Sequence, residues 1–223
     1  MNLLLSSIFV VLVTLVTADT TSAQEIKGDA KAGKGKIATC IGCHGIKGYQ
    51  ASFPEVYKVP MIAGQGSKYI VSALAAYQKG ERRHPTMRGI AQALTDQDMA
   101  DVAAYYEALG RADGAAPPPP GKAPEANAKA AALVAKGACV SCHGEGFNKP
   151  IDPTYPKIAG QHADYLYVAL KSYKTETKAT WGRSNGIMGG IAKQFSNAEL
   201  KELADYVHSF PGELKTVPQA KFK

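Results

Sequence analysis

Two five-residue segments constrain this chain more than any other feature: Cys40-Ile-Gly-Cys-His44 and Cys139-Val-Ser-Cys-His143. Together they use all four cysteines of the 223-residue sequence. In a C-x-x-C-H segment the two thiols add to the vinyl groups of a haem, and the histidine presents an imidazole nitrogen to the iron. The sequence therefore predicts two covalently bound haem c groups. Their attachment residues are Cys40, Cys43, Cys139 and Cys142, and their proximal iron ligands are His44 and His143.

Two other chemistries use a C-x-x-C pair. A redox dithiol is accompanied by a βαβ pattern, and a zinc ribbon brings two C-x-x-C pairs to one four-ligand site. Neither explains why a histidine directly follows the second cysteine in both segments. Short motifs do give false positives, so both alternatives stay open at this point, behind haem attachment.

The N-terminus resembles a secretory signal. A continuous apolar run extends from Leu3 to Val16, and small and polar residues follow from Thr17 to Ala23. The run is shorter than the roughly 20 residues that a spanning helix needs. No Lys or Arg precedes it, which departs from the usual signal pattern. We expect residues 1–23 to be a cleaved signal peptide, with cleavage after Ala18 as the alternative, and the mature protein to be periplasmic.

The mature chain is moderately basic. Removal of residues 1–23 takes away Asp19 and no basic residue, so 26 Lys and Arg face 18 Asp and Glu, a formal charge of +8. Such a charge steers a protein toward acidic partners, allows peripheral association with anionic lipid headgroups, and makes encounters salt-sensitive. Nucleic acid is not expected as a partner, because the lysines are scattered and the chain is exported.

The sequence repeats itself, with three landmarks recurring in the same order. The repeated positions are Cys40 and Cys139, Gln65 and Gln161, and Met87 and Met188. Landmarks that recur in a common order, with only small differences in spacing, indicate a duplicated domain. We expect an N-terminal domain at 24–111, a C-terminal domain at 127–223 and a proline-rich linker at 112–126, extended because it contains Pro117 to Pro120.

Each copy has the pattern of an all-α domain. A helix is expected before each haem motif, a second in the middle of each copy, and a third at its end. The expected ranges are Asp29 to Thr39, Ser67 to Lys79, a helix starting at Thr95, Asn127 to Ala138, Ala163 to Lys174, and a helix starting at Ser196. Thr95 and Ser196 are followed three residues later by Asp98 and Glu199, a capping-box pattern.

The second axial iron ligand separates a carrier from a catalyst. Met87 and Met188 are the repeated methionines, 43 and 45 residues after their proximal histidines, in segments expected to be loops. Met61 aligns with Lys157, and Met99 aligns with Leu200 in a helix stripe, so both have a packing explanation. We therefore expect Met87 and Met188 to be axial ligands.

Three histidines are alternative ligands: His84, His162 and His208. None of them is repeated in the other copy, and a lone histidine is more often a hydrogen-bonded or surface residue. Ligation by histidine and methionine favours ferrous iron and leaves no vacant position, so the expected chemistry is one-electron transfer.

Two arginines recur five residues before each repeated methionine. Arg82 and Arg183 are candidates for contacts with the haem propionates, since a planar guanidinium suits a carboxylate. The alternative is a solvated loop arginine that forms at most a weak surface ion pair.

With these motifs, and with the matching segments Pro-x-Ile-Ala-Gly-Gln that begin at Pro60 and Pro156, the chain resembles the dihaem cytochromes of the cytochrome c4 type. The resemblance extends from Gly28 to about Phe210. It implies two tandem class I cytochrome c domains, each wrapped around a covalently attached haem, and haem attachment outside the cytoplasm. It also implies that Pro60 and Pro156 place a carbonyl near the proximal imidazoles.

The implied function is electron transfer without catalysis, between respiratory donors and an acceptor such as a terminal oxidase. Partners would be redox proteins, either a membrane oxidase or a dehydrogenase. The alternative is a cytochrome subunit of a larger periplasmic dehydrogenase that oxidises, for example, a sulfur compound or an alcohol. A self-contained haem enzyme would need an open axial position, which the duplicated methionine disfavours.

Overall fold

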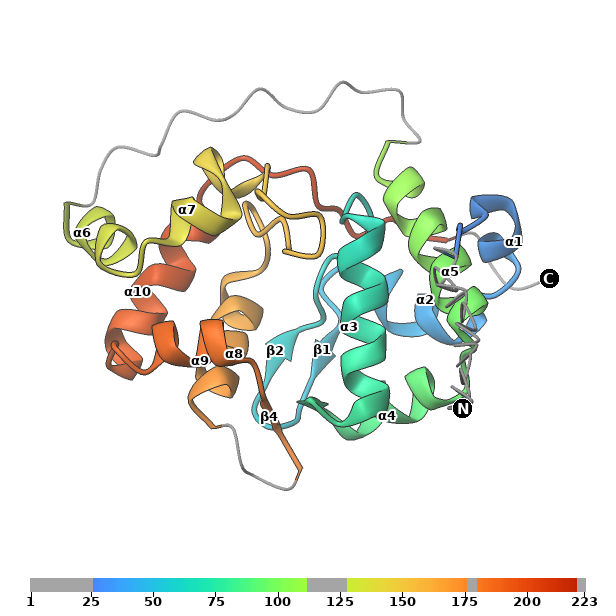
Figure 1. Ribbon diagram of the computed structural model, residues 1–223, viewed down its shortest axis with the longest axis horizontal. Helices are drawn as coiled ribbons and strands as arrows, with labels where there is room; N and C mark the ends of the chain where they lie inside the picture. The colour runs from blue at the N-terminus through green and yellow to red at the C-terminus, as the bar shows by residue number, and fades with distance from the viewer. Residues whose placement is uncertain (1–25, 112–127, 176–179, 220–223) are drawn as a thin grey trace, which may run out of the picture.

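The computed structural model describes residues 26–111, 128–175 and 180–219 (Figure 1). The expected signal peptide and proline-rich linker therefore lie outside the described residues. In the described part of the chain, no helix is both long and apolar enough to cross a membrane.

The N-terminal half is built from helices and three two-residue strands. Its elements are α1 (Ala30–Lys34), α2 (Ala38–His44), β1 (Gln50–Ala51), β2 (Tyr57–Lys58), α3 (Ser67–Lys79), β3 (Arg82–Arg83), α4 (Pro85–Gln92) and α5 (Asp96–Leu109). Helix α5 packs against α1 and α3. The fully buried Met99 lies in the middle of the resulting core.

The C-terminal half repeats this plan. Its elements are α6 (Ala128–Lys136), α7 (Cys139–His143), the 3₁₀ turn η1 (Glu145–Phe147), α8 (Ala163–Lys174), β4 (Gly182–Arg183), α9 (Gly186–Ala192) and α10 (Asn197–His208). Helix α10 packs against α8 and α6, and Leu200 takes the core position of Met99. The two halves lie side by side, with the short strands between them (Figure 1).

Local sequence signals account for most helix boundaries. The middle helices α3 and α8 have the expected bounds. Both expected capping boxes form, since Thr95 and Ser196 accept a hydrogen bond from the N–H of Asp98 and Glu199, and each carboxylate accepts one in return. These reciprocal bonds satisfy N–H groups that a helix leaves unpaired at its start.

Two helix predictions are wrong. The helix expected from Asp29 to Thr39 is divided into α1 and α2 after Lys34. Helix α1 ends at Lys34 with Gly35 as its C-cap, and α2 begins only at Ala38. Within α1, Gly33 packs closely on α5, where a Cβ would lie 2.1 Å from the carbonyl oxygen of Asp101. In the second copy α6 ends at Lys136, and Ala138 has φ 46°, a left-handed conformation that stops the helix before the haem motif.

The C-terminal tail returns to the N-terminal half. The N–H of Lys215 donates to the carbonyl oxygen of Ala63 at 3.0 Å, and Tyr105 Oη donates to Gln219 Oε1 at 2.9 Å. Val217 packs against the N-terminal core. The tail therefore adds a second connection between the halves, in addition to the 112–126 segment.

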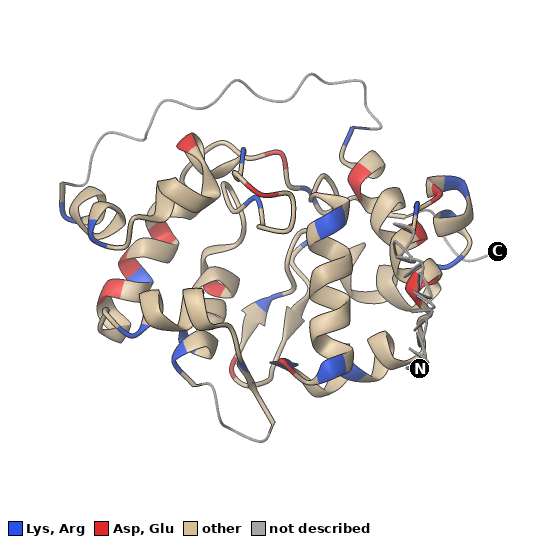
Figure 2. Cartoon of the chain, viewed as in Figure 1, with Lys and Arg blue, Asp and Glu red and all other residues tan. Residues whose placement is uncertain are grey.

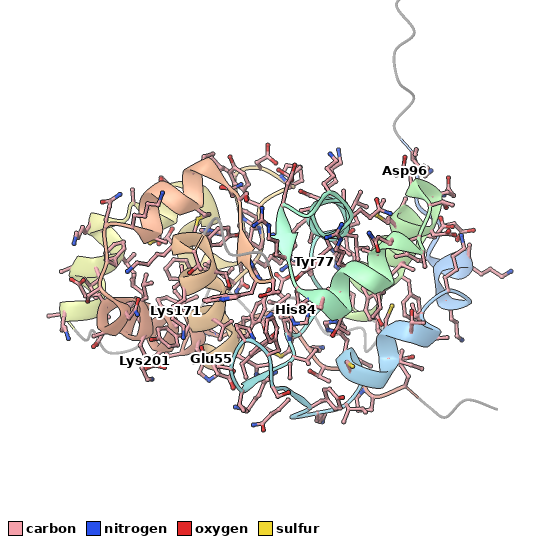
Figure 3. The ribbon with its side chains drawn as sticks, turned by 90° about the horizontal axis from the view of Figure 1, so that it is seen from below. Glu55, Tyr77, His84, Asp96, Lys171 and Lys201 are labelled. Atoms are coloured by element: carbon pink, nitrogen blue, oxygen red, sulfur yellow. The ribbon has the colours of Figure 1, made fainter. Side chains whose placement is uncertain are left out.

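Charged residues are spread over both halves. Figure 2 shows Lys and Arg interspersed with Asp and Glu along the helices. Two ion pairs between described residues join the halves directly. Lys171 Nζ lies 2.5 Å from Glu55 Oε1, and both residues are labelled in Figure 3. Lys58 Nζ lies 3.2 Å from Asp164 Oδ2.

Candidate haem sites

A single continuous cavity of about 620 Å³ reaches into both halves of the molecule. Both haem motifs and both repeated methionines line it: Cys40, Cys43, His44, Met87, Cys139, Cys142, His143 and Met188. The cysteines form no disulfide. Burial raises the pKa of the Cys40 and Cys139 thiols, so both are protonated thiols at neutral pH.

The two histidines predicted as proximal ligands are held in the same way. His44 ends α2, and its Nδ1 lies 2.9 Å from the carbonyl oxygen of Pro60. His143 ends α7, and its Nδ1 lies 3.0 Å from the carbonyl oxygen of Pro156. A carbonyl oxygen only accepts, so Nδ1 carries the proton and Nε2 keeps its lone pair. Burial lowers the pKa of both imidazoles, which favours this neutral, ligating form.

The repeated methionines lie on short helices rather than in the expected loops. Met87 is on α4 and Met188 is on α9. Each helix begins with a side-chain cap: His84 Nδ1 accepts from the N–H of Met87 at 3.3 Å, and Asn185 Oδ1 accepts from the N–H of Met188 at 2.9 Å. Asn185 is a common N-cap residue, whereas His84 is not.

The alternative histidines have other contacts. Besides capping α4, His84 has its Nε2 3.0 Å from Tyr57 Oη, so both ring nitrogens are engaged. His208 Nδ1 lies 2.8 Å from the carbonyl oxygen of Gln161. His162 and His208 line a separate surface hollow, and neither lines the cavity of the haem motifs.

Arg82 and Arg183 lie at the seam between the halves. Strands β3 and β4 pair antiparallel with these two residues directly opposite. Arg82 Nη1 donates to Tyr69 Oη at 3.2 Å, and Arg183 Nη2 donates to Tyr165 Oη at 3.0 Å. The alternative interpretation, in which both residues are solvated loop arginines, is wrong. Arg82 and Arg183 are half-buried and belong to β3 and β4.

Aromatic rings surround the two guanidinium groups. Arg82 Cζ lies 5.2 Å from the centroid of the Tyr69 ring, and Arg183 Cζ lies 5.3 Å from the centroid of the Tyr173 ring. Burial raises the pKa of Tyr173, but Arg183 and Arg82 outweigh it and lower that pKa overall. Among the described residues no carboxylate is paired with either arginine. Two cations that line a cavity, and that pair with no carboxylate in the described part of the chain, fit a cofactor that carries carboxylates.

The donor set therefore fits a covalent haem in each half. Each half offers two thiols, a neutral imidazole with a free Nε2, a thioether and a guanidinium around one cavity. The zinc-ribbon alternative does not fit, because the described residues contain no cluster of three or more His, Cys, Asp or Glu side chains that could hold a metal ion.

Sequence reasoning missed two residues of the site, Gln65 and Gln161. They close the repeated Pro-x-Ile-Ala-Gly-Gln segments, are 3% and 4% exposed, and line the cavity. The sequence shows that the two glutamines are repeated. It does not show their hydrogen-bond partners, because these lie in the opposite half of the molecule.

Fold and site together define a protein with two c-type haems. The family model for cytochrome c matches residues 30–109 and 127–211. Cytochrome c4 of Azotobacter vinelandii is 34% identical over 206 residues, covering 86% of this chain and 94% of the relative. The chain belongs to the cytochrome c family, in its two-haem cytochrome c4 group.

Solved structures agree with this assignment. The crystal structure of reduced recombinant cytochrome c4 from Pseudomonas stutzeri superposes with a TM-score of 0.59 at 28% identity, covering 82% of this chain and 99% of the other. A thiosulfate dehydrogenase of Marichromatium purpuratum superposes with a TM-score of 0.61 at 29% identity, covering 82% of this chain and 40% of the other. A thiosulfate dehydrogenase electron acceptor of Stutzerimonas stutzeri is 32% identical, with 81% of each chain covered.

These relationships confirm several sequence predictions. The protein is an all-α electron carrier with two covalently bound haem c groups, and it is not an enzyme. Its partners are redox proteins.

Proposed function

We propose that this cytochrome is a periplasmic carrier that passes single electrons between respiratory donors and an acceptor such as a terminal oxidase. Residues 1–23 would direct export, and domains at 24–111 and 127–223 would be joined by the linker at 112–126. In each domain the iron would have one histidine and one methionine ligand, His44 with Met87 and His143 with Met188.

One observation carries this proposal: the two halves present the same ligand arrangement to one cavity. In both, a proximal imidazole is bound to a proline carbonyl, and the methionine lies in the first turn of a side-chain-capped helix. Equal arrangements support two saturated irons, which favours electron transfer over substrate binding at either one.

The bound haems supply one-electron cycling between ferric and ferrous iron. The chain's own residues would hold each proximal imidazole neutral, orient it through the proline carbonyl, and balance the propionates with Arg82 and Arg183. Apolar side chains that line the cavity would lower the polarity around a bound haem, which favours the less charged ferrous state.

A second candidate function is a subunit of a dehydrogenase complex. It is supported by the likeness to a thiosulfate dehydrogenase structure and by exposed apolar side chains after the first haem motif, including Ile46, Phe53 and Val56. It predicts a stable partner that co-purifies at high salt. The carrier proposal predicts only weak docking that weakens as salt rises.

The first test is a carbon monoxide titration of the dithionite-reduced holoprotein, followed by optical spectroscopy. Vacant ferrous positions bind this ligand, and saturated positions resist it. We expect no change at either haem. Rapid stoichiometric binding at one haem would overturn the ligand assignment for that domain and with it the proposal of a simple carrier.

A further inference from the structure

Gln65 and Gln161 each reach across to the opposite domain. Gln161 Oε1 accepts from the N–H of Met61 at 3.0 Å, and its Nε2 donates to the carbonyl oxygen of Met61 at 2.9 Å. Gln65 makes the same two contacts with Lys157, at 3.0 and 2.9 Å. The two glutamines are thus related by the internal duplication, and each binds the backbone of the other copy.

The residues that they bind directly follow the prolines of the proximal sites. The peptide group between Pro60 and Met61 accepts from His44 through its carbonyl and donates to Gln161 through its N–H. The peptide group between Pro156 and Lys157 does the same between His143 and Gln65. One peptide unit therefore separates each proximal imidazole from a glutamine of the other domain.

The side chains are fixed in this position. Each Oε1 also accepts from the backbone N–H of the next residue, Gly66 or His162, at 3.0 Å. Both glutamines are almost fully buried, with 3% and 4% of their surface exposed. A buried amide with both ends bonded does not change partner without leaving polar groups unsatisfied.

We propose that Gln65 and Gln161 are positioning residues that tune the haem of the opposite domain. This deepens the proposed function and rests on it. An acceptor on a peptide N–H polarises the same peptide's carbonyl, and hydrogen bonds in such chains strengthen one another. A stronger carbonyl acceptor gives the proximal imidazole more donor character, which stabilises ferric iron. Gln161 therefore lowers the reduction potential of the His44 haem, and Gln65 lowers that of the His143 haem.

The test uses the holoprotein with Gln161→Leu and, as its matched control, Gln65→Leu. Each variant removes the same number of interdomain hydrogen bonds from equivalent positions. Spectroelectrochemical titration gives both potentials, and the haem-methyl resonances of the ferric protein assign each potential to its domain. We expect Gln161→Leu to change the ferrous-to-ferric equilibrium constant of the N-terminal haem by up to about tenfold toward ferrous iron, or about 59 mV upward. Gln65→Leu should move the C-terminal haem instead.

The deciding result is which haem changes its potential: the proposal requires each variant to shift the haem of the opposite domain. A shift of the haem in the variant's own domain, an equal shift of both haems, or no shift would overturn the proposal. If a leucine variant does not fold, Gln161→Glu and Gln65→Glu replace them. A carboxylate accepts the same N–H more strongly, although it cannot donate to the carbonyl of Met61 or Lys157. The larger shift should again fall on the opposite haem, but downward.

Failure of the proposed function would look different. In that case the wild-type protein itself would bind carbon monoxide or show a five-coordinate spectrum, before any variant is compared. Backbone amide exchange gives a readout independent of the haem potential: Gln161→Leu should speed exchange at Met61 and not at Lys157, and Gln65→Leu should do the reverse.

Discussion

Arg82 and Arg183 are direct partners in the antiparallel ladder that joins the two domains. They belong to different copies of the repeat, and each guanidinium lies over tyrosines of its own domain. Burial raises the pKa of Tyr69 to about 12, so its phenol stays protonated as it accepts from Arg82. The seam between the domains thus places two cations beside the cavity that both haem motifs line.

Arg82→Leu should lower the reduction potential of a haem. A fixed positive charge favours the state that has gained an electron, so its loss favours ferric iron. We expect roughly a threefold to tenfold change in the ferric/ferrous equilibrium constant, up to about 59 mV. Spectroelectrochemical titration checks it, with Arg111→Leu as control, because Arg111 is exposed and paired with Glu107. An unchanged or higher potential would refute a role of Arg82 at the cofactor.

Met188→Ala should leave the second axial position of the C-terminal haem iron vacant. Without the thioether, the reduced C-terminal haem is expected to bind one equivalent of carbon monoxide, with a change in its Soret band. Met61→Leu is the control, since Met61 also lines the cavity but contacts Gln161 through its backbone. If the Met188→Ala protein stays closed to carbon monoxide, Met188 is not the ligand.

Asp101→Asn should destabilise the protein at neutral pH and lose its effect in acid. Lys36, the N–H of Asp29 and Gln97 all donate to this carboxylate, and they lower its pKa in the folded state. Because the Asp101 carboxyl has a lower pKa in the folded protein than in the unfolded chain, its ionised form stabilises the fold. This contribution is complete above the unfolded pKa of about 3.9, and it is lost as the pH falls through the folded pKa.

Urea unfolding followed by circular dichroism at pH 7 and pH 3 measures this difference. The gap between wild type and Asp101→Asn should narrow at pH 3. The control is Asp205→Asn, which removes an exposed contact with Lys201 and should change little at either pH. An equal gap at both pH values would show that the charge of Asp101 is not what stabilises the fold.

Leu200→Ala should reduce the free energy of unfolding by about 2–5 kcal/mol, because Leu200 is fully buried and its loss leaves a cavity in the C-terminal core. Ile151→Ala is the control: Ile151 is 72% exposed, so its truncation should change stability by less than about 0.5 kcal/mol. Denaturant unfolding compares the two, and similar losses would contradict the assigned core.

The sequence by itself determined what depends on covalent chemistry and local pattern. The C-x-x-C-H segments specified the two haem c groups and predicted His44 and His143 as proximal ligands, because thiols and imidazole must be adjacent to serve one haem. The bounds of α3 and α8 and the capping boxes at Thr95 and Ser196 followed from short-range periodicity and hydrogen bonding. Duplication predicted Met87 and Met188 as axial ligands in loops, whereas the structure places both on short helices.

Only the tertiary structure decided how the two copies meet. The contact of Gln161 with Met61 joins residues 100 positions apart, and nothing local to either residue specifies it. The pairing of Arg82 with Arg183 and the return of the tail to Ala63 are of the same kind. The close approach of Gly33 to the backbone of α5 is another contact between residues distant in the sequence. Such contacts arise from the shape of two packed domains, and a linear pattern does not contain that shape.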